Sequence, residues 1–168
     1  MNQNIVSSFL DSETFKTVIK SAPLVSIDLC LLFEDEMLLG KRNNEPLKDE
    51  WFTPGGRIRK NERWQNALRR IALSELGLSI DNLRTFELMG IWDHFYQNSY
   101  FDQDISTHYV NLPHFTQLEH KPELLMDDQH RKLGWFKLSR VATGEEFNIH
   151  IRNYALYLIE MVSKHGSS

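Results

Sequence analysis

The sequence predicts one domain of the α/β or α+β class, a sandwich that spans residues 1–168. Three observations support this prediction. The chain has 168 residues, close to the length of about 150 residues that is typical of one domain. Its composition, 41% hydrophobic and 25% charged, is typical of a folded globular protein. Apolar strand-like runs also alternate with helix-like segments along the chain.

The N-terminal part predicts a helix, a β-hairpin and a short strand. Asp11 or Ser12 is a suitable N-cap for the helix, and the acidic turn at 34–36 joins the two hairpin strands. A polar loop separates the hairpin from the short strand, which leads into Pro54-Gly55-Gly56. In order, the predicted helix and strands are 12–22, 24–33, 37–42 and 51–53.

The clearest predicted helix follows these glycines. Asn61 is a good N-cap, Glu62 suits the positive end of the helix dipole, and Gly77 is the expected C-terminal glycine. An apolar stripe at spacings of three and four is typical of a helix that packs on a sheet. Its members are Trp64, Leu68, Ile71 and Ala72.

The C-terminal half predicts further strands and one amphipathic helix. Polar loops separate these elements, one of them at 121–131. The strands are expected at 86–96, 107–115 and 135–136, and the helix at 149–163.

Charge and cysteine content exclude several kinds of protein. The net charge of −4 disfavours non-specific nucleic-acid binding, which needs a basic face. The single cysteine, Cys30, excludes an intrachain disulfide and is expected in the core. The longest apolar run, 24–33, is far shorter than the roughly 20 residues that cross a bilayer. With no signal-peptide pattern, the expectation is a cytoplasmic protein that binds neither membrane nor nucleic acid.

One carboxylate on the predicted helix is out of place. Glu75 follows Ile71 by four residues and Leu68 by seven, so it continues the apolar stripe. A charge at the buried edge of a helix must be paired or coordinated. The helix alone leaves two interpretations open, a salt bridge to one of the arginines or a role in a site.

Residues 55–78, GGRIRKNERWQNALRRIALSELGL, resemble the Nudix box. That box has Gly, five residues, Glu, seven residues, Arg, Glu, an aliphatic residue, any residue, Glu, Glu, any residue, Gly and an aliphatic residue. The matching positions here are Gly56, Glu62, Arg70, Glu75, Gly77 and Leu78. The resemblance implies an α/β/α sandwich with a mixed β-sheet between helices.

Two carboxylates of the box are replaced in this chain. Ile71 stands where the Glu after Arg70 is expected, and Ser74 replaces the first of the paired Glu residues. Most Nudix hydrolases use these carboxylates to hold two or three Mg²⁺ ions, which prefer oxygen ligands. With Glu75 remaining, one metal ion is expected, and the general base must lie elsewhere.

The same replacements are found in one Nudix subfamily, GDP-mannose mannosyl hydrolase, and the resemblance to it covers most of the chain. The segments that carry it are PLVSID (23–28), LLGKR (38–42), WFTPGGR (51–57), RIALSELGL (70–78), GIWDHFY (90–96), THYV (107–110) and DDQH (127–130). It implies a homodimer that hydrolyses GDP-mannose, or another GDP-hexose, to GDP and free sugar. Water attacks the anomeric carbon with inversion. The family often accompanies surface-polysaccharide biosynthesis.

The resemblance also implies a ligand set for the metal and the diphosphate. One Mg²⁺ per active site, with Mn²⁺ as an alternative, is held by the Gly55 carbonyl, Glu75 and Gln129. Arg42 and Arg57 bind the pyrophosphate and act in catalysis by offsetting its charge. A guanidinium fork suits phosphate oxygens better than the point charge of a lysine.

The remaining implied residues act on water and sugar. His130 matches the general base of the family, and its ordinary pKa of about 6.5 lets a neutral imidazole accept a proton from water. Asp28, His94 and Tyr109 match substrate contacts. Without the resemblance, these three are equally compatible with a satisfied hydrogen-bond network in the core.

Other aromatic and polar positions carry structural expectations. Glu62 and Arg70 are expected to brace the loop and helix. Trp51, Phe52, Trp92 and Phe95 are expected in the core rather than stacked on a base. The sequence departs from the subfamily at 97–105 and 131–133, so the identity of the sugar stays open.

Two alternative functions stay open as well. One is a nucleotide-sugar pyrophosphatase that cleaves at phosphorus, which the replacements at Ile71 and Ser74 disfavour. The other is a non-catalytic Nudix module that binds a nucleotide sugar, which the retained Glu75, Gln129 and His130 disfavour.

Overall fold

The computed structural model describes residues 10–80, 85–124 and 130–165, with the backbone alone for His130, Arg131 and His165. The helices are α1 (Ser12–Ser21), α2 (Trp64–Leu76), α3 (Leu138–Thr143) and α4 (Ile149–His165). The strands are β1 (Leu24–Phe33), β2 (Glu36–Arg42), β3 (Trp51–Phe52), β4 (Gly55–Arg57), β5 (Glu87–Leu88), β6 (Trp92–Tyr96), β7 (Thr107–Asn111), β8 (His114–Leu118) and β9 (His130–Lys137).

Strand β1 is the centre of a mixed sheet. It pairs antiparallel with β2 and β4, and parallel with β7 and β8. Strand β2 continues the sheet to β3 and β9, while β7 continues it to β6. Because β1 is ten residues long, its first half pairs with β4 and β7 while its second half pairs with β2 and β8.

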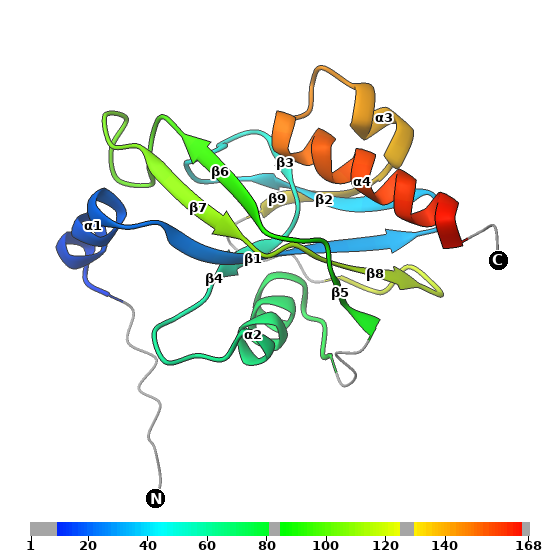
Figure 1. Cartoon of the computed structure of the whole chain (residues 1–168), viewed down its shortest axis with the longest axis horizontal. Helices are drawn as coiled ribbons and strands as arrows, with labels where there is room; N and C mark the ends of the chain where they lie inside the picture. Colours follow the sequence, from blue (N-terminus) through cyan, green and yellow to red (C-terminus); the bar gives the residue numbers. More distant parts are fainter. Residues whose placement is uncertain (1–9, 81–84, 125–129, 166–168) are drawn as a thin grey trace, which may run out of the picture.

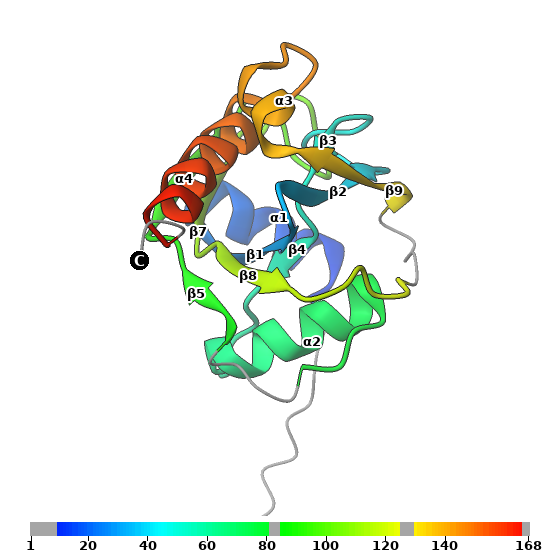
Figure 2. The ribbon, with the colours of Figure 1, turned by 90° about the vertical axis from the view of Figure 1, so that its right-hand side faces the viewer.

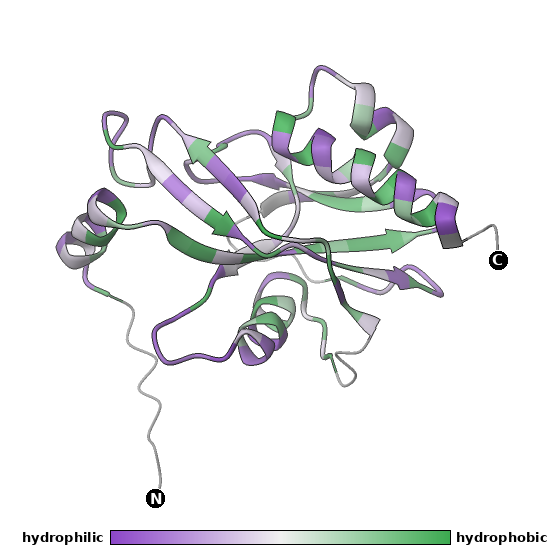
Figure 3. Ribbon diagram, viewed as in Figure 1, coloured by the Kyte–Doolittle hydropathy of each residue, from purple (hydrophilic) through white to green (hydrophobic). Residues whose placement is uncertain are grey.

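Helices cover both faces of this sheet (Figures 1 and 2), as the α/β/α prediction required. Helix α2 lies against one face, and α3 and α4 lie against the other. Helix α1 lies beside the end of β7, outside the two layers. Figure 3 shows the hydrophobic colour along β1 and the hydrophilic colour over the loop that leads into α2.

Side chains alternate along β1 between two cores. Ile27, Leu29 and Leu31 pack with α2, whereas Cys30 and Leu32 pack in the core formed with α3 and α4. A strand period of two produces this division. Cys30 is fully buried, as expected. Asp28 shares the parity of Cys30 and therefore points toward α4, where the hydroxyl of Tyr154 meets its carboxylate.

Several predicted boundaries were wrong. The run at 86–96 is broken into β5 and β6 at Gly90, whose φ of 114° is left-handed. The run at 107–115 is broken into β7 and β8 at Pro113, which has no backbone N–H for the ladder. Strand β4 and helix α3 were not predicted, and β9 is longer than expected.

The start of α2 also differs from the prediction. The helix begins at Trp64 with Arg63 as its N-cap, so Asn61 is not the cap and Glu62 precedes the first turn. Asn61 has a φ of 66° and belongs to the preceding turn. Trp64 is 42% exposed rather than buried, whereas Gly77 ends the helix with a φ of 68°, as predicted.

Within the described ranges, none of the helices combines the length and the apolar character needed to cross a membrane.

Candidate functional site

A cavity of about 670 Å³ opens where the first half of β1 meets β4, β7 and the end of α2. Its volume is in the range of small-molecule sites. The cavity brings together six of the predicted site residues, which five separate elements supply. They are Asp28 (β1), Arg42 (β2), Gly55 and Arg57 (β4), Glu75 (α2) and Tyr109 (β7).

Gly55 allows the closest approach between β1 and β4 in this wall. It lies opposite Asp28 in the ladder. A Cβ at Gly55 would lie 2.5 Å from Oδ1 of Asp28 and 2.7 Å from the carbonyl oxygen of Ile27. Since the second atom belongs to the backbone, no side chain fits there. Only glycine therefore lets the Asp28 carboxylate and the β4 backbone share this part of the cavity.

Asp28 is 5% exposed and has a specific partner. The hydroxyl of Tyr154 in α4 donates to its Oδ2 at 2.9 Å. Burial raises the pKa of Asp28 to about 7, while the Tyr154 hydrogen bond and the charge of Arg42 oppose that rise. Asp28 thus changes charge near neutral pH, in a cavity that also contains arginines.

Glu75 is 4% exposed and lines the same cavity. The predicted position on the apolar stripe is confirmed, because Leu68, Ile71 and Ala72 on the same helix are buried too. Its carboxylate is a hard oxygen ligand that faces a cavity rather than bulk solvent. This placement puts the Glu75 carboxylate in the same cavity wall as the arginines.

The replaced carboxylate positions have other structural roles. Ile71 is 1% exposed and packs under Gly56, where a Cβ would lie 3.1 Å from its Cγ1. The Ser74 hydroxyl donates to the Ile71 carbonyl at 3.3 Å. At these two positions the chain therefore has an apolar side chain and a hydroxyl bonded to the helix backbone, in place of acidic metal ligands.

Arginines dominate the positive charge of the cavity. Among the described residues, four line it: Arg42, Arg57, Arg59 and Arg70. The Arg42 guanidinium is anchored by donation from Nε to the Pro46 carbonyl at 3.1 Å. Such an arrangement suits a polyanionic ligand, because guanidinium groups form paired hydrogen bonds with phosphate oxygens.

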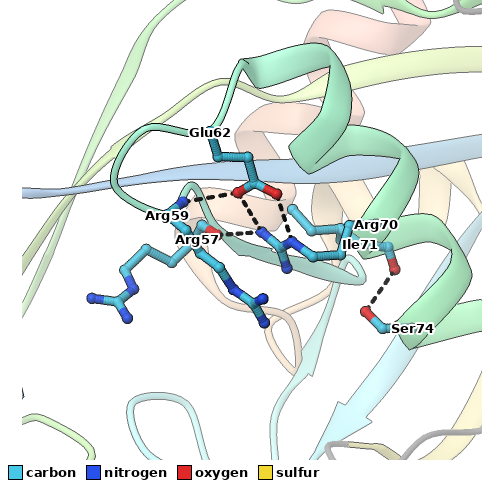
Figure 4. A network of polar contacts seen from close by, with 6 residues as sticks. All are labelled: Arg57, Arg59, Glu62, Arg70, Ile71 and Ser74. Atoms are coloured by element: carbon cyan, nitrogen blue, oxygen red, sulfur yellow. Dashed lines mark hydrogen bonds and ion pairs between the residues drawn. The ribbon is translucent and has the colours of Figure 1, made fainter. Parts of the chain in front are cut away.

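Glu62 and Arg70 brace the loop that follows Arg57, as expected. Arg70 donates from Nε and Nη2 to the two Glu62 oxygens at 2.7 and 2.8 Å. Its Nη2 also donates to the Arg57 carbonyl at 2.9 Å, and the Arg59 amide donates to Glu62 at 2.9 Å (Figure 4). Hydrogen bonds from Arg70 lower the pKa of Glu62. The network holds the backbone that leads from β4 into α2.

Helix α1 contributes an aromatic contact to Arg57. The Arg57 guanidinium carbon lies 4.2 Å from the centre of the Phe15 ring, a cation–π distance. Phe15 packs edge-on against Phe101 at 5.5 Å, and both line the cavity. Residues of the 97–105 loop thus line part of the cavity together with α1.

Tyr109 lies in the wall with Tyr96, and their ring centres are 6.2 Å apart. Burial raises the pKa of both phenols, so both stay neutral near pH 7 and can donate hydrogen bonds. Tyr96 was not predicted as a site residue.

His94, predicted as a substrate contact, is not among the residues that line the cavity. It is 1% exposed and lies parallel to His150, with ring centres 3.8 Å apart. Its Nδ1 accepts from the side-chain amide of Asn111, whose carbonyl oxygen accepts from Ser26. Ser26 and Asn111 line the cavity, so His94 supports the wall from behind. Burial lowers the pKa of His94 to about 3, which keeps the ring neutral.

The predicted base, His130, is the first residue of β9. Gln129 lies outside the described residues. The backbone of His130 pairs with Arg42 of β2, next to a register shift after Lys41. The fold therefore brings the backbone of residue 130 next to Arg42, which lines the cavity, although the two residues are far apart in the sequence.

The donor set fits one hard cation bound together with its substrate. Within the described ranges, no three His, Cys, Asp or Glu side chains are grouped for a metal ion. Glu75 and the backbone at Gly55 supply oxygen atoms at one cavity, and Mg²⁺ commonly combines one or two carboxylates with substrate phosphates.

Two residues that contact predicted site residues were missed because no local signal marks them. Tyr154 is one of many apolar-face residues in α4, and Phe15 is an ordinary apolar residue of α1. Only the unusual position of Asp28 in an apolar strand indicated that a polar partner must exist. Phe95, expected in the core, is 65% exposed, whereas Phe52 is buried.

Comparisons with known proteins identify the family. The NUDIX domain family matches residues 23–157. The chain is 37% identical over 129 residues to "Low-salt glycan biosynthesis protein Agl8" of Haloferax volcanii, covering 76% of this chain and 80% of that protein.

Solved structures agree on the fold. A MutT NUDIX hydrolase from Burkholderia pseudomallei has a TM-score of 0.65 at 23% identity, covering 82% of this chain and 98% of that one. The NUDIX domain of Shewanella oneidensis NrtR, complexed with ADP ribose, has a TM-score of 0.65 at 16% identity, covering 96% and 99%. This chain belongs to the Nudix family.

Proposed function

We propose that this protein hydrolyses GDP-mannose, or a related GDP-hexose, to GDP and free sugar with Mg²⁺ as cofactor. One observation carries the proposal. Three positions where the Nudix helix is expected to carry glutamate line the cavity, and they hold different side chains: position 75 keeps Glu, position 71 is an Ile that packs under Gly56, and position 74 is a Ser whose hydroxyl bonds back to the helix. A site with few acidic ligands suits attack at carbon, where the diphosphate leaves as an intact group.

The diphosphate would bind at the arginines. Arg42 and Arg57 line the cavity from β2 and β4, which both pair with β1, and would hold its oxygens. As the bond from the anomeric carbon to oxygen breaks, negative charge grows on GDP, and fixed guanidinium groups offset that charge. Since GDP then leaves without protonation, no general acid is required, unlike in most inverting glycosidases.

The metal would be held by Glu75, the Gly55 carbonyl and Gln129, together with diphosphate oxygens. When bound, it supplies positive charge that polarises the leaving group. His130 would take a proton from the attacking water on the opposite side of the sugar. Asp28 and Tyr109 would accept from or donate to sugar hydroxyls, and His94 would act through Asn111.

The relatives support a sugar-linked role. The Haloferax relative is described as a glycan biosynthesis protein, and the Shewanella domain was solved with ADP ribose, a sugar attached to a diphosphate. We therefore also propose that the protein serves glycan or polysaccharide biosynthesis. By resemblance to the GDP-mannose mannosyl hydrolases we expect a homodimer; a light-scattering mass near 19.8 kDa would refute this expectation.

The test is product analysis. The protein is incubated with GDP-mannose and Mg²⁺ and followed by ³¹P and ¹H NMR. GDP with β-mannose as the first free anomer is the expected result. GMP with mannose 1-phosphate would show attack at phosphorus and overturn the proposal. If GDP-mannose and the other GDP-hexoses bind without turnover, the chain is a binding module.

A further inference from the structure

We propose that Tyr154 is a positioning residue for the sugar end of the cavity, because it holds one oxygen of the Asp28 carboxylate and leaves the other for substrate. This inference rests on the proposed function. It assigns to helix α4, which otherwise packs on the sheet, a part in recognition of a polyhydroxylated ligand.

The first step is the rigidity of the tyrosine. Tyr154 is 0% exposed, and three rings surround it. Trp92 meets it edge-on at 5.2 Å, His94 lies at 5.5 Å and Phe52 at 6.4 Å. A ring packed on these sides has one available orientation, since buried side chains occupy single rotamers in a dense core. The hydroxyl is therefore a fixed donor.

The second step is the geometry at the carboxylate. Tyr154 donates to Oδ2 at 2.9 Å, which is a well-formed hydrogen bond. Oδ1 lies close to Gly55, because a Cβ built on that glycine would be 2.5 Å from this oxygen. The two oxygens thus have different surroundings, one directed at α4 and the other at the β4 side of the cavity wall. Oδ1 is the atom placed to accept from a ligand.

The third step concerns the choice of a neutral donor. A lysine or arginine at 154 would neutralise Asp28 by an ion pair inside the core. A phenol holds one carboxyl oxygen without forming an ion pair, so the other oxygen stays available to accept from a hydroxyl group of a ligand. Hydrogen bonds to charged groups are stronger than neutral ones, and losing this one would free the carboxylate to turn.

The test compares Tyr154→Phe with Tyr157→Phe. Tyr157 is on the same helix and packs against Trp92 at 6.2 Å, so its variant controls for the loss of a hydroxyl from α4. We expect Tyr154→Phe to lower kcat/KM for GDP-mannose by about 10- to 100-fold, the range for a hydrogen bond to a charged group. Inhibition by GDP, which has no sugar, should be unchanged, and Tyr157→Phe should match the wild type.

A double-mutant cycle separates positioning from general packing. In the Asp28→Ala background Tyr154 has no carboxylate to hold, so Tyr154→Phe should cause no further loss. A full additional loss there, a parallel loss of GDP inhibition, or wild-type kinetics in Tyr154→Phe would each overturn the proposal.

A structural readout keeps this proposal separable from the proposed function. If the wild type turns over no GDP-hexose, the proposed function fails. Crystal structures of the wild type and Tyr154→Phe then decide the positioning role. A carboxylate of Asp28 that rotates in the variant supports it, and one that keeps its orientation overturns it.

Discussion

Glu62 and Arg70 form a two-pronged ion pair, with Nε–Oε1 and Nη2–Oε2 distances of 2.7 and 2.8 Å, directly behind Arg57. Because Arg70 also donates to the Arg57 carbonyl, the pair links α2 to the end of β4. The side chains are 14% and 27% exposed for Glu62 and Arg70, so solvent screens this pair less than an ordinary surface pair. It stabilises the loop between two site-bearing elements.

Glu62→Gln should therefore reduce both stability and activity at neutral pH. Hydrogen bonds to charged groups contribute about 1.5–3 kcal/mol, so we expect a loss in the free energy of unfolding of about that size. Since the folded-state pKa of Glu62 is lowered, its contribution is present above its ordinary value of 4.5 and is lost as pH falls through the folded-state pKa.

Urea unfolding at pH 7 and in acid measures this dependence. The matched control is Glu146→Gln, which breaks a more exposed pair with Arg140 and should change stability little at pH 7. An equal effect of the two substitutions, or a Glu62→Gln effect that persists in acid, would contradict the bracing role.

Glu75→Gln should abolish metal-dependent turnover. Loss of even an outer-shell partner of a metal costs roughly 10- to 100-fold, so loss of a direct carboxylate ligand should lower kcat/KM by roughly 100-fold or more. Chelation of the wild type should stop turnover and added Mg²⁺ should restore it. Glu87→Gln, at an exposed position on β5, serves as the control. Wild-type Mg²⁺ activation in Glu75→Gln would remove Glu75 from the ligand set.

His130→Gln should lower kcat by roughly 10²–10⁴-fold, the range for loss of a general base. GDP inhibition should be retained, because the base acts on water rather than on the diphosphate. His120→Gln, at an exposed position, is the comparison variant. Initial rates with GDP-mannose decide the matter, and near-wild-type turnover in His130→Gln would exclude the assigned role.

Asp28→Asn should stabilise the protein more at pH 8 than at pH 5. The folded-state pKa of Asp28 is raised from 3.8 to about 7, so the folded state favours its protonated form. That stabilisation is complete below about pH 4 and is lost as pH rises through about 7. Asparagine carries no charge at either pH, so the variant does not lose stability as the pH rises.

Thermal unfolding of both proteins at pH 5 and 8, without divalent cations, measures the difference in Tm. The exposed Asp104→Asn variant should show the same small offset at both pH values. A Tm difference between Asp28→Asn and wild type that does not grow from pH 5 to pH 8 would be inconsistent with a buried, proton-binding carboxylate.

Regular local patterns made much of the fold predictable. The hairpin of β1 and β2, the helix ending at Gly77 and the final helix follow from apolar periodicity and end signals. Where two short strands adjoin, as around Gly90 and Pro113, the apolar run continues through the break and hides it. Strand β4 is only three residues long and includes two glycines, so its pairing with β1 has no local signature.

The helix that carries the Nudix box, the buried position of Glu75 on it and the replacement of two acidic residues could all be read from the sequence, because they depend on spacing within one element. Which residues meet in the cavity could not, because they come from separate elements. Tyr154 reaches Asp28 across 126 positions, and His94 lies behind Asn111 instead of in the cavity wall. The physical reason is that a local period fixes which face a side chain occupies, whereas its partners depend on how separate elements pack together.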